Sequence, residues 1–211
     1  MRGVLMGKYR RKQRGSTIIE VLMAITVLAI GASGVIAMQK VAVSANRNSR
    51  NIAVANEIAR TWLERTRADA ILWNYPLNSP MSDLEADTLW LRRVTNDEPA
   101  FAPWFRPVDA IGICGIHDVF GRDEPCSVGE DSQGPYCVNM RLSWIRSTER
   151  SMRVEVRVFW VIRNDGEGAL PASDLPCGDA VNPPDVDLMA NNGIVRVVHA
   201  VTAVTMNDGP M

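Results

Sequence analysis

The chain has 211 residues, of which 46% are apolar and 22% charged, and this composition excludes a disordered or fibrous protein and a large multidomain enzyme. The formal net charge of −1 hides an uneven distribution. The first 15 residues carry six basic side chains and no acid, whereas the rest of the chain carries 17 basic and 24 acidic side chains. This basic end is too short to be a folded nucleic-acid-binding domain, so we expect no nucleic-acid partner.

An apolar segment follows the basic residues. Residues 16–39 contain one charged side chain, Glu20, and 19 uncharged residues separate it from Lys40. In a helix those residues would span roughly 28 Å, close to the ~30 Å hydrocarbon core of a bilayer. We therefore expect residues 16–39 to be the transmembrane half of a helix, with the basic end in the cytoplasm and the chain exported from Lys40 onward.

Two simpler readings of this segment are less satisfactory. A cleaved secretory signal has an apolar core of only ~7–15 residues and a polar cleavage region, whereas here the helical pattern continues past Lys40 and Glu20 lies near its start. A plain single-pass anchor would explain the length of the segment. It gives no reason for the presence of Glu20.

The start of the segment resembles a known processing signal. Residues 14–22, with the sequence RGSTIIEVL, are similar to the class III signal of type IV pilins and type II secretion pseudopilins. The resemblance implies that prepilin peptidase cleaves between Gly15 and Ser16, removes residues 1–15 as a basic leader, and N-methylates Ser16. Phe or Met often stands in the family where this chain has Ser16. Translation from Met6 would shorten the leader to ten residues.

Glu20 would be the fifth residue of the processed chain. A carboxylate in the apolar part of a membrane costs a few kcal/mol unless it is protonated, paired or near the interface. The new amino group of Ser16 would lie about 6 Å away along the helix and could pair with it. The family resemblance implies instead a contact with the terminal amine of a neighbouring subunit during assembly. A carboxylate resting at the lipid interface, near a helix N-terminus, is the alternative.

Residues 40–70 continue the helix with an amphipathic pattern. Charged side chains fill one face, and apolar side chains recur on the other at spacings of three and four: Ile52, Ala55, Ile58, Ala59, Trp62 and Leu63. This pattern predicts a helix that reaches about Ala70 and packs its apolar stripe on a sheet.

Residues 71–211 should form the globular head. A proline-rich stretch from Pro76 to Pro135 predicts irregular structure. Alternating patterns predict strands at 138–145 and 152–162 with a turn between them, and a largely apolar third strand at 194–206, which we expect to be central. A loop at 171–192 precedes that strand. The expected fold class is α+β: a pilin-like long N-terminal helix packed on a small antiparallel sheet of three or four strands.

Four cysteines lie on the exported side, in or beside the irregular regions: Cys114, Cys126, Cys137 and Cys177. An even number of cysteines in an exported domain predicts two disulfides, for which three pairings are possible. Their spacing does not suit a zinc site.

Other polar clusters have weaker functional interpretations. His117 stands beside Asp118 and His199 lies within a predicted strand, but no catalytic motif accompanies them, so we expect no enzyme, no cofactor and no metal. Four acids in the 171–192 loop could bind calcium, although a solvated loop is favoured: Asp174, Asp179, Asp185 and Asp187. Six arginines on the predicted hairpin could meet DNA or an acidic neighbour, although a solvated sheet face is favoured: Arg141, Arg146, Arg150, Arg153, Arg157 and Arg163.

A longer match narrows the resemblance. Residues 19–39 and 59–67 look like PilV-type minor pilins, also called type IV pilus modification proteins. The resemblance implies a minor pilin that primes pilus assembly at the filament tip, with major and minor pilins, prepilin peptidase and the inner-membrane assembly platform as partners. Its head would be periplasmic before assembly and on the cell surface afterwards. The alternatives are a minor pseudopilin of type II secretion and a membrane-anchored periplasmic binding or enzyme domain.

Overall fold

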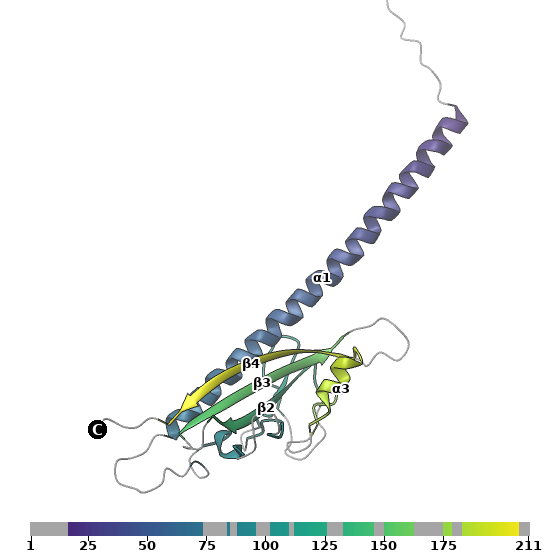
Figure 1. Ribbon diagram of the computed structural model, residues 1–211. Coiled ribbons are helices and arrows are strands. Elements are labelled where there is room, and N and C mark those ends of the chain that lie inside the picture. Colours follow the sequence, from purple (N-terminus) through teal and green to yellow (C-terminus); the bar gives the residue numbers. More distant parts are fainter. Residues whose placement is uncertain are drawn as a thin grey trace, which may run out of the picture. The chain divides into compact units, whose positions relative to one another are not determined.

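The computed structural model describes residues 17–73, 84, 88–95, 102–109, 112–125, 133–145, 150–162, 175–178 and 183–206. The named elements are α1 (Ile18–Leu72), η1 (Leu91–Arg93), β1 (Ile116–His117), β2 (Tyr136–Trp144), β3 (Ser151–Val161), α3 (Val186–Asn191) and β4 (Val195–Thr205) (Figure 1). Two compact units divide the chain, Met1–Ser49 and Arg50–Met211, and their boundary falls within α1. A long N-terminal helix with a small antiparallel sheet is the pilin-like α+β fold expected from the sequence.

The second half of α1 buries one face in the head. Ala55, Ile58, Ala59 and Trp62 are all at most 2% exposed, at the helical spacing that the sequence predicted. The buried face continues through Thr66 and Asp69 to Ala70, so two polar side chains extend the apolar stripe. Ile52 and Leu63 lie at the margin of this face rather than within it.

The sheet is antiparallel throughout, in the order β1-β2-β3-β4. The long pairings run from Cys137↔Phe159 to Trp144↔Met152 between β2 and β3, and from Ser151↔Thr205 to Val161↔Val195 between β3 and β4. The central strand is therefore β3. The expectation that the last strand would be central is wrong, because β4 forms an edge.

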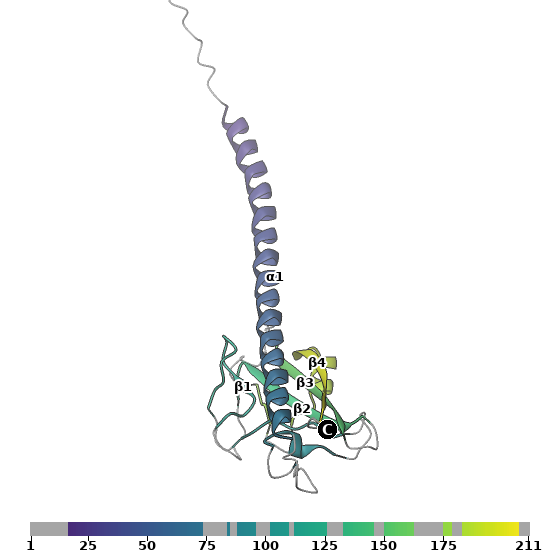
Figure 2. The same cartoon turned by 90° about the vertical axis from the view of Figure 1, so that its left-hand side faces the viewer.

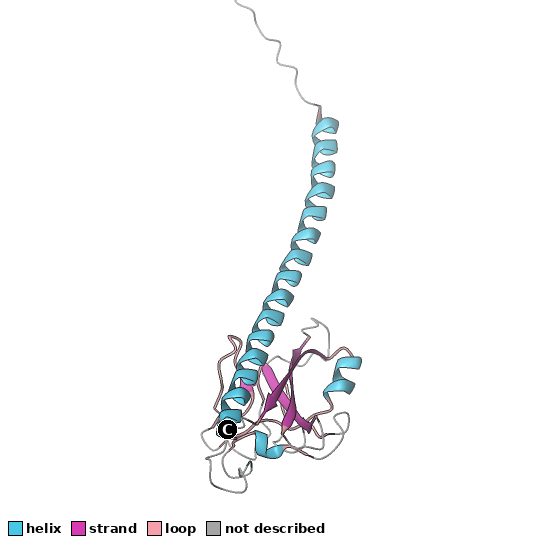
Figure 3. Ribbon diagram, turned by 60° about the vertical axis from the view of Figure 1, so that its left-hand side comes forward, coloured by secondary structure: helices cyan, strands magenta, loops and turns pink. Residues whose placement is uncertain are grey.

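Apolar side chains cover both faces of the sheet. On the α1 face, Val138, Met140, Val154 and Val156 pack with Trp62, and in Figure 2 the lower half of α1 lies in front of the sheet. On the opposite face, a second cluster joins α3 to the ends of the strands through Phe159, Val186, Val195, Leu175 and Cys177. Figure 3 shows α1 and α3 on opposite sides of the sheet. A strand covered on both sides reads as a nearly continuous apolar run. β4 is also largely apolar, which suggested a central position, although its odd-numbered residues from His199 to Thr205 are exposed.

The charged side chains of the hairpin are partly interior, which corrects the expected solvated face. Arg157 is 2% exposed, donates to Asn139 (Nε to Oδ1, 3.1 Å) and lies 4.2 Å from the ring centroid of Trp104. Burial lowers the pKa of Arg157 to about 10. Glu155 is also buried and pairs with Arg141 and Arg153. Arg146 and Arg163 lie outside the described residues.

The predicted loop at 171–192 contains the short helix α3. Asp185 caps this helix by accepting the Leu188 N–H at 2.9 Å. Asp187 pairs with Arg157 across 3.4 Å. Of the acids considered for calcium, Asp185 therefore caps α3 and Asp187 pairs with a buried guanidinium. Asp174 and Asp179 lie outside the described residues.

Candidate processing and assembly site

Glu20 lies in the first turn of α1. The helix begins at Ile18, and the Thr17 carbonyl accepts hydrogen bonds from the N–H groups of Glu20 (3.0 Å) and Val21 (3.3 Å). A carboxylate in the first turn is favourably placed, because the unsatisfied N–H groups there carry partial positive charge. Gly15 and Ser16, the expected cleavage and methylation positions, lie outside the described residues.

The first half of α1 presents apolar side chains on all sides. Large apolar side chains more than 45% exposed in this unit are Ile18, Ile19, Val21, Leu22, Met23, Ile25, Val27, Leu28, Ile30, Val35, Ile36, Met38, Val41 and Val43. A helix that is apolar all round needs lipid or other helices about it. Of the described residues, only those of α1 form a helix long and apolar enough to cross a membrane.

Polar groups within this apolar segment are satisfied locally. The Thr26 hydroxyl donates to the Met23 carbonyl and the Ser33 hydroxyl to the Ile30 carbonyl, both at 2.8 Å. Each side chain therefore meets its hydrogen-bonding requirement without a partner from outside the helix, which suits an apolar environment.

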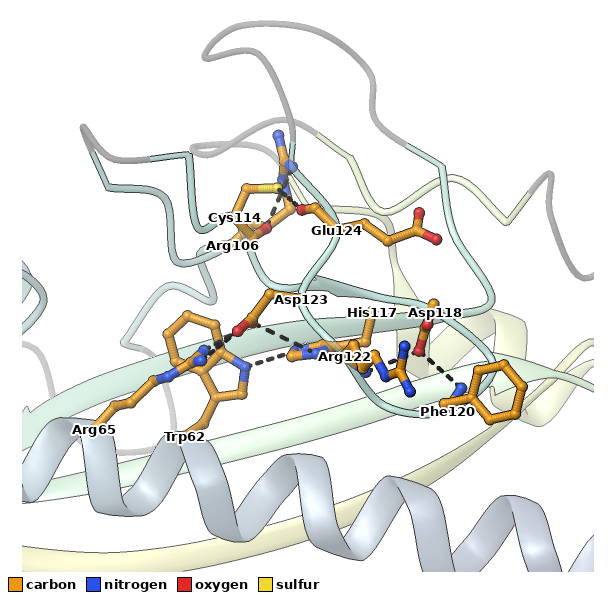
Figure 4. A network of polar contacts seen from close by, with 10 residues as sticks. All are labelled: Trp62, Arg65, Arg106, Cys114, His117, Asp118, Phe120, Arg122, Asp123 and Glu124. Carbon is orange, nitrogen blue, oxygen red and sulfur yellow. Dashed lines mark hydrogen bonds and ion pairs between the residues drawn. The ribbon is translucent and has the colours of Figure 1, made fainter.

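The head has a polar network that joins α1 to the irregular segment around β1 (Figure 4). Trp62 donates from Nε1 to Nε2 of His117 at 2.9 Å, and His117 Nδ1 lies 3.6 Å from Asp123 Oδ1. Arg65 donates to Asp123 (NH1 to Oδ1, 2.9 Å) and places its guanidinium 4.8 Å from the Trp62 ring centroid. Two helix residues thus hold two residues of the proline-rich stretch.

This network keeps His117 neutral. Nε2 accepts a hydrogen bond and so carries no proton, and burial lowers the pKa of His117. The hydrogen bond from Arg65 lowers the pKa of Asp123. His117 is 1% exposed, so its imidazole serves the interior of the head and is not presented to a substrate at the surface.

The Asp118 carboxylate closes a turn, and it acts on its neighbour His117 through its charge. The carboxylate accepts the backbone N–H groups of Phe120 and Arg122, both at 2.8 Å, and these backbone bonds lower the pKa of Asp118. The turn closes against α1 at Gly121, where φ is 81° and a Cβ would stand 3.3 Å from Val54 Cγ1. The His-Asp pair of the sequence is therefore divided between a buried network and a surface turn.

A disulfide joins Cys137 on β2 to Cys177, across a sequence separation of 40 residues. Such a loop closure stabilises the folded state by about 4 kcal/mol in the chain-entropy treatment. Cys114 is also disulfide-bonded, and Cys126 lies outside the described residues. The observed bond ties segment 175–178, which has no long element of its own, to the sheet.

Sequence reasoning missed Asp69, the buried carboxylate at the end of α1. It is 3% exposed and accepts three backbone N–H groups, from Leu89 (2.8 Å), Trp90 (2.9 Å) and Leu91 (3.0 Å). The sequence signal for this role was the position of Asp69, an acid that stands on the buried stripe of the helix where an apolar residue is expected. It did not reveal the acceptor role, because the three donors come from a separate segment.

Comparison with known proteins identifies one feature of this chain. Residues 10–36 match the model of the prokaryotic N-terminal methylation motif. No curated protein and no solved structure matches the chain. The matched residues include Glu20 and the first turns of the apolar helix. The chain thus carries the N-terminal signal of type IV pilins and pseudopilins in front of a pilin-like α+β head.

Proposed function

We propose that this chain is a minor pilin that takes part in type IV pilus assembly and priming, at the filament tip. The methylation motif at residues 10–36 carries the proposal. It supports cleavage by prepilin peptidase between Gly15 and Ser16 and methylation of Ser16. Before assembly the chain would sit in the inner membrane with a periplasmic head, and afterwards on the cell surface within the filament.

Glu20 has the assembly role in this proposal. Its position in the first turn of an exposed apolar helix lets a neighbouring helix bring a positive terminal amine to it. In the low dielectric of a helix bundle that attraction is stronger than in water. The contact would set the axial position of one subunit against the next, and the apolar side chains would then pack.

The processing step is tested by the mass of the N-terminus. We expect protein from purified surface filaments to begin at a methylated Ser16, and Gly15→Ala to leave residues 1–15 attached in cells that contain the peptidase. Ser44→Ala, which changes a small residue away from the cut, is the matched control. A chain that is absent from all filaments and keeps its leader would contradict the proposal.

The assembly step is tested by Glu20→Ala. Removal of one charge makes residues 16–39 more apolar, so membrane insertion should persist. Incorporation into filaments should fall, since the carboxylate is lost. Thr26→Ala, a polar residue whose hydroxyl is bonded within the helix, should behave like the unmodified chain. Normal incorporation of Glu20→Ala would remove the role assigned to Glu20.

A minor pseudopilin of type II secretion is the second candidate, because the same motif occurs in both classes. Deletion of the gene separates them by phenotype. Loss of surface pili with normal protein secretion supports the pilus, and loss of secretion with normal pili supports the pseudopilus.

A further inference from the structure

The outer edge of β4 presents a regular row of backbone groups. In an antiparallel ladder, residue pairs that exchange hydrogen bonds alternate with residue pairs that do not. The Ile162 N–H donates to the Ile194 carbonyl, and the Met206 N–H donates to the Arg150 carbonyl, both at 2.9 Å. The even-numbered residues of β4 therefore face β3. The odd-numbered residues direct their N–H and C=O groups away from it: Val195, Val197, His199, Val201, Ala203 and Thr205.

This edge has few of the features that normally prevent strand pairing; the charged, exposed Arg196 lies near its start. Natural edge strands are short, bulged, or carry proline, lysine or inward charges. β4 is 11 residues long, contains no Pro, Gly, Lys, Asp or Glu, and keeps an unbroken register with β3. None of the residues that the structure describes pairs with its outer side. Val201, near its middle, has a side chain that is 53% exposed.

The opposite edge of the sheet is closed. β1 pairs with β2 at Cys137 and Tyr136. Further along β2, the Val138 N–H donates to the Gly115 carbonyl, and Met140 and Phe105 exchange two backbone hydrogen bonds. Thr95 bridges to Ser143 near the end of the strand. A second copy of this chain therefore offers no open β2 edge to β4.

The direction of β4 limits pairing between two copies of β4. Tyr136 bonds to Asn51 at one end of β2, and Trp144 contacts Trp73 at the other, so β2 runs in the direction of α1. β4 is antiparallel to β3, as β2 is, and so it also runs with α1, as the arrow in Figure 1 shows. Antiparallel pairing of two β4 strands would point their helices in opposite directions. Parallel pairing would place the helices on opposite faces of the joined sheet.

We propose that the outer edge of β4 binds an extended strand of a different pilin-like subunit, which completes the sheet between two heads. The inference rests on the proposed function, because that function requires neighbouring α1 helices to run in one direction and to meet in one bundle. Both β4–β4 arrangements break this requirement, and the β2 edge is closed. The partner is recognised through main-chain hydrogen bonds from the odd-numbered residues of β4.

The test uses the full chain in cells that make filaments. A photo-crosslinking amino acid is placed at Val201, and at Leu188 on α3 as the control, a site that is 57% exposed. We expect position 201, and not position 188, to crosslink to another chain that has its own methylation motif. Ala203→Pro removes an outward N–H without touching the ladder to β3, and should reduce the crosslink by about tenfold. Ala203→Ser keeps that N–H and should retain the crosslink.

Three results would overturn the proposal: a crosslink to a second copy of this chain, equal crosslinking from position 188, or indifference to Ala203→Pro. Hydrogen exchange on the purified chain adds a fourth, since slow exchange at Val201 and Ala203 would show that the chain covers its own edge. Should Ala203→Pro fail to fold, Ala203→Lys provides the same block through a charge at the edge. Cleavage after Gly15 is measured in the same cells. A retained leader contradicts the proposed function. Normal cleavage, together with a crosslink that Ala203→Pro does not reduce, contradicts only the proposed role of the β4 edge.

Discussion

Asp69 joins the end of α1 to the segment that contains η1. A buried carboxylate is costly unless it is hydrogen-bonded, and this one accepts three backbone N–H groups that no helix or strand ladder uses. The arrangement satisfies both the carboxylate and the three N–H groups. Without Asp69, these donors would be buried without acceptors near Leu91, which is 0% exposed. A side chain of α1 therefore anchors the proline-rich stretch at Leu89, Trp90 and Leu91.

Asp69→Ala should lower the free energy of unfolding by about 2–4 kcal/mol, since it leaves buried donors without an acceptor. Asp69→Asn keeps one acceptor oxygen and should cost less. The measurement is urea denaturation of the full chain in detergent micelles, followed by tryptophan fluorescence. Glu57→Ala, an exposed acid on the same helix, is the matched control and should change stability by less than about 0.5 kcal/mol. Equal effects of the two alanine variants would contradict this account.

His117 should make the head less stable in mild acid. Its pKa is lowered by burial in the folded state, so below the ordinary value of about 6.5 the unfolded chain binds a proton that the folded chain does not. Stability is therefore full above that pH and falls as the pH decreases toward the folded pKa. The charged groups that face the ring are Arg65 from α1, which opposes protonation, and Asp118 and Asp123, which favour it. Protonation at Nε2 would also break the hydrogen bond from Trp62.

The comparison is the free energy of unfolding between about pH 7.5 and pH 5.5 for three chains. The unmodified chain should lose stability across this range. His117→Gln, which keeps an acceptor for Trp62, should lose much less. His199→Gln removes the other histidine, whose pKa is also lowered by burial and by Arg157. Because His199 is exposed on β4 and His117 is 1% exposed, this variant should remove the smaller part of the pH dependence. A pH dependence that follows His199 instead would exclude His117 as its source.

The two sides of β4 have different backbone roles, and this difference can be tested within the folded chain. Ala200 is an even-numbered residue whose N–H faces β3, and Val201 is its odd-numbered neighbour whose N–H faces outward. Ala200→Pro should lower the free energy of unfolding by about 3 kcal/mol, because it removes a ladder hydrogen bond and strands a carbonyl of β3. Val201→Pro should cost clearly less. Chemical denaturation of both variants measures the two losses in free energy of unfolding. Equal losses would show that the assignment of even-numbered N–H groups to β3 and odd-numbered N–H groups to the outer edge is wrong.

Strand patterns predicted the two long hairpin strands to within two residues at each end, because apolar and polar side chains alternate along the sequences of β2 and β3. The same patterns placed 194–206 at the centre of the sheet. Periodicity reports which faces of a strand are covered and not which edges are paired. β4 has the head core on one face, and the α3 cluster covers only its first residues on the other. Its apolar composition nevertheless matched that of a central strand.

The head should fold without the apolar half of α1. Every side chain in the two core clusters belongs to the unit Arg50–Met211, and the first buried core residue is Ala55. A fragment of residues 50–211, purified oxidised, should unfold in one cooperative transition. Reduction should destabilise it by more than about 4 kcal/mol, because it opens the Cys137–Cys177 loop and also breaks the disulfide of Cys114. A fragment without near-ultraviolet circular dichroism would show that residues 17–49 contribute to the head.

Local features of the chain were enough to predict the long helix, the apolar segment around Glu20, the resemblance to a pilin signal and the α+β class. Each depends on residues that are neighbours in sequence, where charge, hydropathy and helical or strand spacing act directly. The buried roles of Arg157 and Asp69, the division of His117 from Asp118, and the edge position of β4 were not predictable in this way. They depend on which distant segments come to lie against one another, because the cost of burying a charge, or of leaving a backbone N–H unpaired, is set by the partner opposite and not by the residue next along the chain.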